Sequence, residues 1–264
     1  MQQIVYISRR LFLVPVIAGL LCSCAPKQYI RLQPISGPVA SVDGRLVTKA
    51  SADSVEIVAS YEREDMEYMA LDIEIKNHTT HAIDIDPADF QIELLDADRQ
   101  PLQLSGTTNK RQAADPGYEF NRSEYKIKRE EKRLKTAKII NTIALVAVVA
   151  SDIASSSTSR NTRDFRSWVS NRATHNVAYN LIQAKRVIDH GVFADRMQRY
   201  QFEAYRWREL ALKRMLVQPG ESARGFVYLP KQTKAAFMNL SYPTASGTSI
   251  EVLFEQTLSK AKPK

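Results

Sequence analysis

The period of the hydrophobic residues changes twice along this chain of 264 residues. Between residues 53 and 105, apolar and polar side chains alternate, which is typical of half-buried strands in an antiparallel sheet. Residues 118–215 follow a helical period with few breakers, and from Gln218 the alternation returns. Neither β half holds enough strands to close a sandwich alone. The pattern therefore predicts an α+β chain in which one antiparallel β-sandwich, residues 53–110 and 217–258, is interrupted by a helical insertion at residues 118–215.

Three helices are expected within this insertion. The first covers about residues 118–156 and ends at a loop rich in Ser, Thr, Arg and Asn. The second covers residues 162–190, with Thr162 as a candidate N-cap, and the third covers residues 192–215. Gly191 separates the second and third, because glycine is the commonest residue just past a helix C-terminus.

The N-terminal residues have the zones of a secretory signal. Arg9 and Arg10 precede an apolar run at residues 11–21. As a helix that run would cover about 17 Å, short of the roughly 30 Å hydrocarbon core of a bilayer. The run is therefore expected to be a signal-peptide segment and not a spanning helix.

The apolar run ends in Leu21-Cys22-Ser23-Cys24, which resembles the lipobox of bacterial lipoproteins. The resemblance implies removal of residues 1–23 and lipidation of the Cys24 thiol. The alternative is an ordinary secretory signal with two incidental cysteines. Because the chain has only these two cysteines, the mature protein would hold one blocked cysteine, with neither a disulfide nor a thiolate metal site. The resemblance further implies a lipid-anchored location in the cell envelope, at the outer membrane if the cell is Gram-negative, since Ala25 is not Asp.

The segments that flank the predicted sandwich have little periodicity. Residues 24–52 contain several Pro and Gly residues and are expected to form a tether between the lipid and the folded body. The alternative is a first strand at residues 45–48 that joins the sheet. The polar tail, residues 259–264, is expected to fray.

Three motifs in the β halves carry a family resemblance. A strand ends in Lys76-Asn77, an Asp86-Pro87 loop precedes an aromatic strand start at Phe90, and a Pro219-Gly220 turn leads into a strand that ends at Pro230. Together they resemble bacterial immunoglobulin-like, telokin-like domains of unknown function that follow lipoprotein signals. The resemblance covers less than half of the mature chain and leaves out the insertion. It implies an immunoglobulin-like sandwich and a binding or assembly module rather than an enzyme.

Residues 139–154 are the most apolar part of the insertion. Their middle, residues 143–150, would cover about 12 Å of helix, too short to span a bilayer. A helix that is apolar all round must be buried, either against other helices of this molecule, against another protein or a second copy, or in a membrane surface. The candidate interaction residues in this segment are Ile143, Leu145, Val146, Val148 and Val149.

The insertion is also strongly basic, with 20 Lys and Arg against 10 Asp and Glu. A cytoplasmic protein with such a surface and interleaved aromatics would be a candidate for nucleic-acid binding. An envelope location instead favours lipid headgroups or an acidic protein and argues against nucleic acid. The alternative is a solvated face with i,i+4 ion pairs such as Glu131–Lys135. The candidate contact residues are Arg129, Lys132, Arg133, Arg199, Arg206 and Trp207.

Other clusters lack the partners that their chemistry needs. His78 and His81 lack the further ligands that zinc requires, and the Asp84, Asp86 and Asp89 trio lacks a calcium loop. His175, Asp189 and His190 occur without a nucleophile elbow. No metal, cofactor or catalytic residue is expected.

These observations lead to one expected function and one alternative. We expect a lipid-anchored, non-enzymatic envelope protein whose helical insertion binds another envelope protein or a second copy. The alternative is a lipoprotein that binds a lipid or a glycan in a cleft between sandwich and helices.

Overall fold

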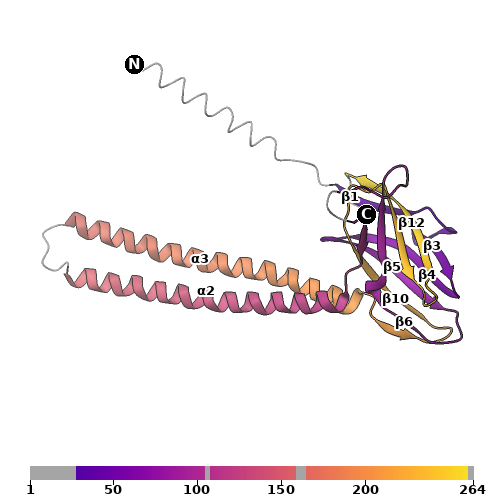
Figure 1. The fold of residues 1–264 in the computed structure, drawn as a ribbon. Helices are drawn as coiled ribbons and strands as arrows, with labels where there is room; N and C mark the ends of the chain where they lie inside the picture. The colour runs from indigo at the N-terminus through magenta and orange to yellow at the C-terminus, as the bar shows by residue number, and fades with distance from the viewer. Residues whose placement is uncertain (1–27, 105–107, 159–164, 261–264) are drawn as a thin grey trace, which may run out of the picture. The chain divides into compact units, whose positions relative to one another are not determined.

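The computed structural model describes residues 28–104, 108–158 and 165–260, and these residues have an α+β fold with antiparallel sheets (Figure 1). Cys24 and the predicted signal peptide lie outside the described residues. The chain divides into two units. We call residues 28–113 with 214–260 the β unit, and residues 114–213 the helical unit. The predicted boundaries of the insertion, residues 118 and 215, fall close to these.

The β unit contains twelve strands and one short helix among its described residues. The first strands are β1 (Tyr29–Pro34), β2 (Val39–Val42), β3 (Arg45–Ala52), β4 (Val55–Asp65), β5 (Tyr68–Asn77) and β6 (Ile83–Ile85). The 3-10 helix η1 (Pro87–Asp89) follows, and then β7 (Gln91–Leu95) and β8 (Lys110–Gln112). After the helical unit come β9 (Met215–Val217), β10 (Ser222–Pro230), β11 (Phe237–Pro243) and β12 (Ser249–Ser259).

These strands form two five-stranded sheets and one small one. One sheet has the order β1-β12-β11-β7-β8, the other has the order β10-β5-β4-β3-β2, and β6 pairs with β9. All of the neighbouring strands are antiparallel. The two large sheets contact each other through β1 and β12 on one side and β3 and β4 on the other. Fully buried side chains from both sheets, such as Ile57, Leu71 and Phe254, make the core between them.

The structure corrects the expected tether at residues 24–52. Residues 29–52 supply three strands, and β1 pairs with β12 while β3 pairs with β4. The alternative, a strand at residues 45–48, agrees with β3. The breakers interrupt the strands and do not form a linker, because Gly37 and Gly44 take positive φ values of 72° and 78° in the turns between them. At the other end, β12 extends to Ser259, and residues 261–264 lie outside the described part.

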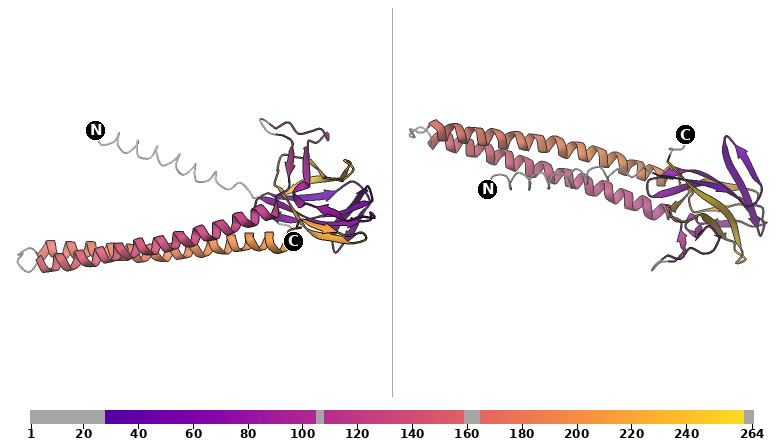
Figure 2. Two further views of the ribbon diagram at one scale, coloured as in Figure 1. Left: turned by 60° about the horizontal axis from the view of Figure 1, so that its bottom comes forward. Right: turned by 90° about the horizontal axis from the view of Figure 1, so that it is seen from above.

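The helical unit has two long helices, so the prediction of three helices is wrong. Helix α2 (Pro116–Thr158) and helix α3 (Phe165–Tyr205) have 43 and 41 residues, and they lie side by side as an antiparallel hairpin in both views of Figure 2. The α2 start is well capped, since the Asp115 carboxylate accepts hydrogen bonds from the Gly117 and Tyr118 amides and Pro116 occupies the first turn. A single π-helical turn, η3 (Arg206–Leu210), follows α3.

Helix α3 continues through Gly191, the residue expected to end it. Gly191 is not among the glycines with positive φ, so it has no C-capping conformation. Glycine inside a helix costs only about 1 kcal/mol relative to alanine. Contacts with α2 on either side of it, through Asp189 and Arg196, hold this part of α3 in place.

Candidate interaction surface

Polar side chains between α2 and α3 set the register of the hairpin. Near its base, Lys126 donates to Glu203 at 2.7 Å, and Arg196 donates to Glu130 at 3.0 Å. Both glutamates are buried, so each ion pair is shielded and hydrogen-bonded within the interface.

Further along the hairpin, the buried Asn141 donates to Asp189 at 3.0 Å, and the Ser151 hydroxyl lies 3.2 Å from Nε2 of His175. These four contacts place each segment of α2 beside one defined segment of α3.

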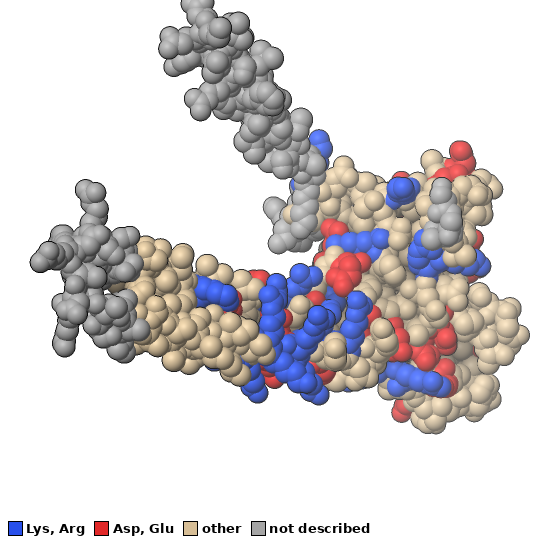
Figure 3. All heavy atoms as spheres, turned by 60° about the vertical axis from the view of Figure 1, so that its left-hand side comes forward, with Lys and Arg blue, Asp and Glu red and all other residues tan. Residues whose placement is uncertain are grey.

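Lysine and arginine gather on one part of the hairpin, while its distal part is largely uncharged (Figure 3). Arg129 and Lys132, two of the candidate contact residues, are exposed on α2. Arg133 pairs with Glu130 at 3.6 Å, and Arg199 pairs with Glu203 at 3.5 Å. Part of the basic character therefore neutralises buried acids and does not form a free cationic face.

Arg206 and Trp207 are not surface residues, although both were predicted as contacts. Their exposed fractions are 1% and 2%, and the Arg206 guanidinium lies over the Trp207 ring at 4.6 Å from its centroid. Both belong to the π-helical turn η3. That turn displaces side chains from the α-helical positions that sequence spacing alone implies.

The apolar segment of α2 faces solvent within this chain. Ile143 is 64% exposed and Val146 is 62% exposed, and Val149 is exposed as well. Leu145 and Val148 are half-buried. Burial of the whole segment against other helices of the molecule, one of the three expected possibilities, is therefore wrong. In a two-helix hairpin each helix covers only one side of its neighbour, and no third helix is described that could cover the other side.

Helix α3 carries a second exposed apolar set, which the sequence analysis missed. Val177, Leu181, Val187, Ile188 and Val192 are all exposed. Their signal is present in the sequence, because Val177, Leu181, Ala184 and Ile188 have the four-three-four spacing of one helix face. A hollow of about 280 Å³, lined by side chains of both helices that include Val149 and Tyr179, lies beside these residues.

Length and composition make α2 a candidate for membrane insertion. Between Pro116 and Ser151 it contains a window apolar enough to cross a bilayer, and only 6% of that window is buried. The adjacent part of α3 is much more polar, however, with Lys185, Arg186 and Asp189 beside it. Burying such charges in hydrocarbon is costly. A helix surface with apolar stripes between polar positions is better matched to another helix than to lipid.

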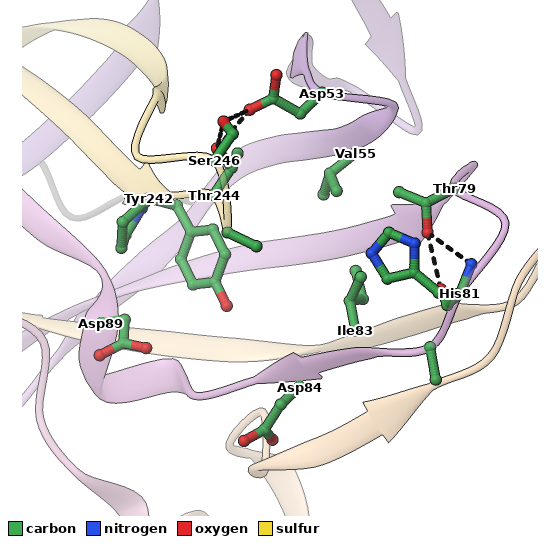
Figure 4. A pocket seen from close by; sticks show the side chains of 13 residues that line it. Asp53, Val55, Thr79, His81, Ile83, Asp84, Asp89, Tyr242, Thr244 and Ser246 are labelled. Atoms are coloured by element: carbon green, nitrogen blue, oxygen red, sulfur yellow. Dashed lines mark hydrogen bonds between the residues drawn. The ribbon is translucent and has the colours of Figure 1, made fainter.

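The β unit has a pocket of about 500 Å³ lined by four segments of its chain (Figure 4). His81 and Ile83 come from the segment that leads into β6, and Tyr242 comes from β11. In Figure 4 the Tyr242 ring and the His81 imidazole lie on facing sides of this pocket, with Asp84 and Asp89 at its lower edge.

Hydrogen bonds close one rim of this pocket. The Asp53 carboxylate accepts hydrogen bonds from the hydroxyls of Thr244, Ser246 and Thr248, and these bonds lower the pKa of Asp53 to about 2. On the opposite rim, burial raises the pKa of Asp89 and raises that of Tyr242 to about 12. The Asp53 cluster is satisfied internally and serves the turn that joins β11 to β12.

The remaining sequence clusters have structural partners. The Arg214 guanidinium donates a bidentate pair of hydrogen bonds to the Asp84 carboxylate, at 2.6 and 3.4 Å. It also lies 3.6 Å from the Asp86 carboxylate. These bonds join β6 to the start of β9 and lower the pKa of Asp84. Among the residues that the structure describes, no group of three or more His, Cys, Asp or Glu side chains is placed to hold a metal ion.

His175 of the helical unit lies far from Asp189 and His190. His175 and Asp189 lie on one helix, 14 residues apart, which corresponds to about 21 Å. Asp189 instead accepts hydrogen bonds from Lys185 and Asn141, which lower its pKa. The triad-like set considered from the sequence is therefore not assembled within one copy of the chain.

Comparisons with known proteins give no relative for this chain: no family model, no curated protein sequence and no solved structure matches it.

Proposed function

We propose that this chain is a lipid-anchored cell-envelope protein that acts as a non-enzymatic assembly module and uses its helical hairpin as the binding surface. The observation that carries the proposal is the exposure of apolar side chains on both helices of the hairpin, including Ile143, Val146 and Ile188. Apolar surface in water is unfavourable by about 25 cal/mol per Å², so a stripe of this kind favours a bound partner.

The anchor in this proposal is Cys24. The lipobox sequence Leu21-Cys22-Ser23-Cys24 supports lipidation, which would hold the protein at a membrane by acyl chains at about 0.8 kcal/mol per buried CH₂. With the anchor supplied by lipid, the hairpin is not needed for membrane attachment and is available for a protein partner.

We also propose that the β unit is an immunoglobulin-like sandwich. Strands β4, β5 and β10 are neighbours in one sheet, and β7, β11 and β12 are neighbours in the other. This arrangement corresponds to the A-B-E and C-F-G sheets of immunoglobulin-like domains, with the hairpin inserted between C and E. Such domains act as rigid supports for inserted binding elements.

A photo-crosslinking amino acid at Val146 of the full-length, lipid-anchored chain tests the proposed function in intact cells. We expect a protein adduct of discrete mass after irradiation. The matched control places the same amino acid at Asp98, an exposed turn position of the β unit, where no discrete adduct is expected. Adducts to lipid alone at position 146, or no adduct, would overturn the proposal.

The pocket of the β unit supports a second candidate function, binding of a small glycan. Its volume of about 500 Å³ and its mixture of apolar and hydroxyl-bearing lining residues suit a ligand of that size. Titration with an N-acetylglucosamine disaccharide should shift the amide NMR signals of Tyr242 and Ala245. Ala245→Trp, which fills the pocket, should abolish the shifts. Absence of shifts in the unaltered protein at saturating sugar would remove this candidate.

A further inference from the structure

The exposed apolar residues of the hairpin form two stripes with a seven-residue repeat. On α2, Lys132, Ile139 and Val146 are seven residues apart, and on α3, Leu181, Ile188 and Asp195 are seven residues apart. Seven residues rotate a helix by about 700°, within about 20° of two full turns, so each set lies along one line of its helix. All six side chains are exposed.

The register of the hairpin places these two stripes at the same level. Glu130 contacts Arg196, so Lys132 on α2 lies level with Asp195 on α3. Asn141 contacts Asp189, so the apolar positions that follow Ile139 on α2 lie level with those around Ile188 on α3. Each stripe therefore runs from one charged residue into apolar residues, in the same direction along the hairpin but with opposite charge.

We propose that the partner of this surface is a second copy of the same chain, whose hairpin packs against this one. The α2 stripe lies on the side of α2 opposite its inward positions Leu134, Asn141 and Val148, so it points away from α3 of its own chain. It therefore packs against the α3 stripe of a second copy in a heterologous, head-to-tail interface. The apolar positions interdigitate as coiled-coil seam residues, and Lys132 of one copy pairs with Asp195 of the other.

Charge and stripe width favour a second copy over lipid as the occupant. A lipid surface would solvate an anionic Asp195 poorly next to apolar residues, whereas Lys132 of a second copy neutralises it. The stripes are also narrow, with Asn180 and Lys185 close to the α3 line, and a narrow seam suits a helix.

This inference rests on the proposed function, because it names the partner that the hairpin binds. The test uses the full-length chain with the photo-crosslinker at Val146 and reverses the two charges. Lys132→Glu alone and Asp195→Lys alone should each reduce the yield of an adduct that contains two copies of this chain, on the order of tenfold. The double variant, Lys132→Glu with Asp195→Lys, should restore the yield.

The control is Lys138→Glu, which makes the same charge change at an exposed position about 100° around α2 from the stripe and should leave the yield unchanged. Far-UV circular dichroism of each purified variant checks that the hairpin is retained. An adduct to a different protein would overturn the second-copy inference while leaving the proposed function intact. No protein adduct at all would overturn both. A two-copy adduct that the charge reversals do not affect, or that the double variant does not recover, would overturn the proposed pairing.

Discussion

At the residue scale, buried polar groups in the β unit are matched by local partners. Asn77, at the end of β5, has no exposed surface, and its side-chain amide donates to the carbonyls of His81 at 2.8 Å and Val217 at 2.9 Å. Its oxygen accepts from the backbone and hydroxyl of Thr79. One side chain thus ties the strand end to the turn that follows it and to the residue at which the chain returns from the helical unit.

Asn77→Ala should lower the free energy of unfolding of the β unit by about 2 kcal/mol, because the buried Val217 carbonyl loses its side-chain donor and the part-buried His81 carbonyl loses one of two. Urea denaturation monitored by far-UV circular dichroism measures the change in the free energy of unfolding. The matched control is Asn239→Ala, which removes a hydrogen bond that is exposed to solvent and should change stability by no more than about 0.5 kcal/mol. Equal effects of the two variants would contradict the role given to Asn77.

Asp53 gives a prediction about acid stability. Its pKa is lowered from 3.8 to about 2 by three hydroxyl donors, so the folded state holds its carboxylate more firmly than the unfolded state does. This contribution is present above pH 4 and is lost as the pH falls from about 4 to about 2. Asp53→Asn should therefore flatten the dependence of the melting temperature on pH within that window. Asparagine tolerates the positive φ of 52° at this position, so the substitution isolates the charge. An unchanged pH profile would contradict the prediction.

At the element scale, contacts with α2 override the local signal that should end α3. Gly191 was expected to separate two helices, yet α3 runs through it. A Cβ atom built at Gly191 meets nothing within 4 Å, so glycine is not required there for packing. Gly191 is a residue of low helix propensity within a helix that contacts with α2 stabilise.

Gly191→Ala should stabilise the helical unit by about 1 kcal/mol, because alanine has the higher helix propensity and restricts the unfolded chain. Thermal unfolding monitored at the helical circular dichroism band measures the change. Gly37→Ala provides a contrast of opposite sign. Its φ is +72°, and an added Cβ would lie 2.6 Å from the Lys49 carbonyl oxygen, so that variant should be destabilised. A destabilised Gly191→Ala would show that α3 needs flexibility at this point.

At the scale of the whole molecule, we expect function to depend on the apolar side chains that remain exposed on α2 and α3 of the hairpin. Two neighbouring apolar residues of α2 have opposite environments: Ile143 is exposed and Leu145 is half-buried toward α3. Substitutions at Ile143 and at Leu145 therefore distinguish an effect on partner binding from an effect on the stability of the hairpin. The same reasoning applies to Lys132 and Asp195, whose charges are exposed in one copy and are proposed to meet between two.

Ile143→Glu should leave the melting temperature unchanged and abolish the crosslinked protein adduct formed through Val146. Leu145→Glu should instead lower the stability of the helical unit by about 2 kcal/mol, since it places a charge against α3 and removes apolar contact. Circular dichroism melts together with adduct yields distinguish the two effects. Loss of helical stability in Ile143→Glu would indicate that this residue is covered within one copy.

The amino-acid sequence alone determined the elements whose signal is local. Alternation predicted the strands around Ile73, Ile92 and Val252, and helical spacing predicted the helical unit that interrupts the strands, because a strand or helix must turn its apolar side chains to one face whatever it packs against. Breakers were less informative: Gly37 and Gly191 are both glycines, yet one makes a turn and the other lies inside a helix.

Which apolar residues are covered follows from how distant segments of the chain pack against one another. The sequence of residues 139–154 indicated that they need burial. It did not indicate that α3 would be the single helix packed against them. Likewise, Arg206 and Trp207 were predicted to lie on the surface, but both are buried in a π-helical turn. Lys132, predicted in the same way, is exposed. Periodicity shows which face of a segment is apolar, but the segment that covers this face lies far away in the chain and cannot be identified from that period.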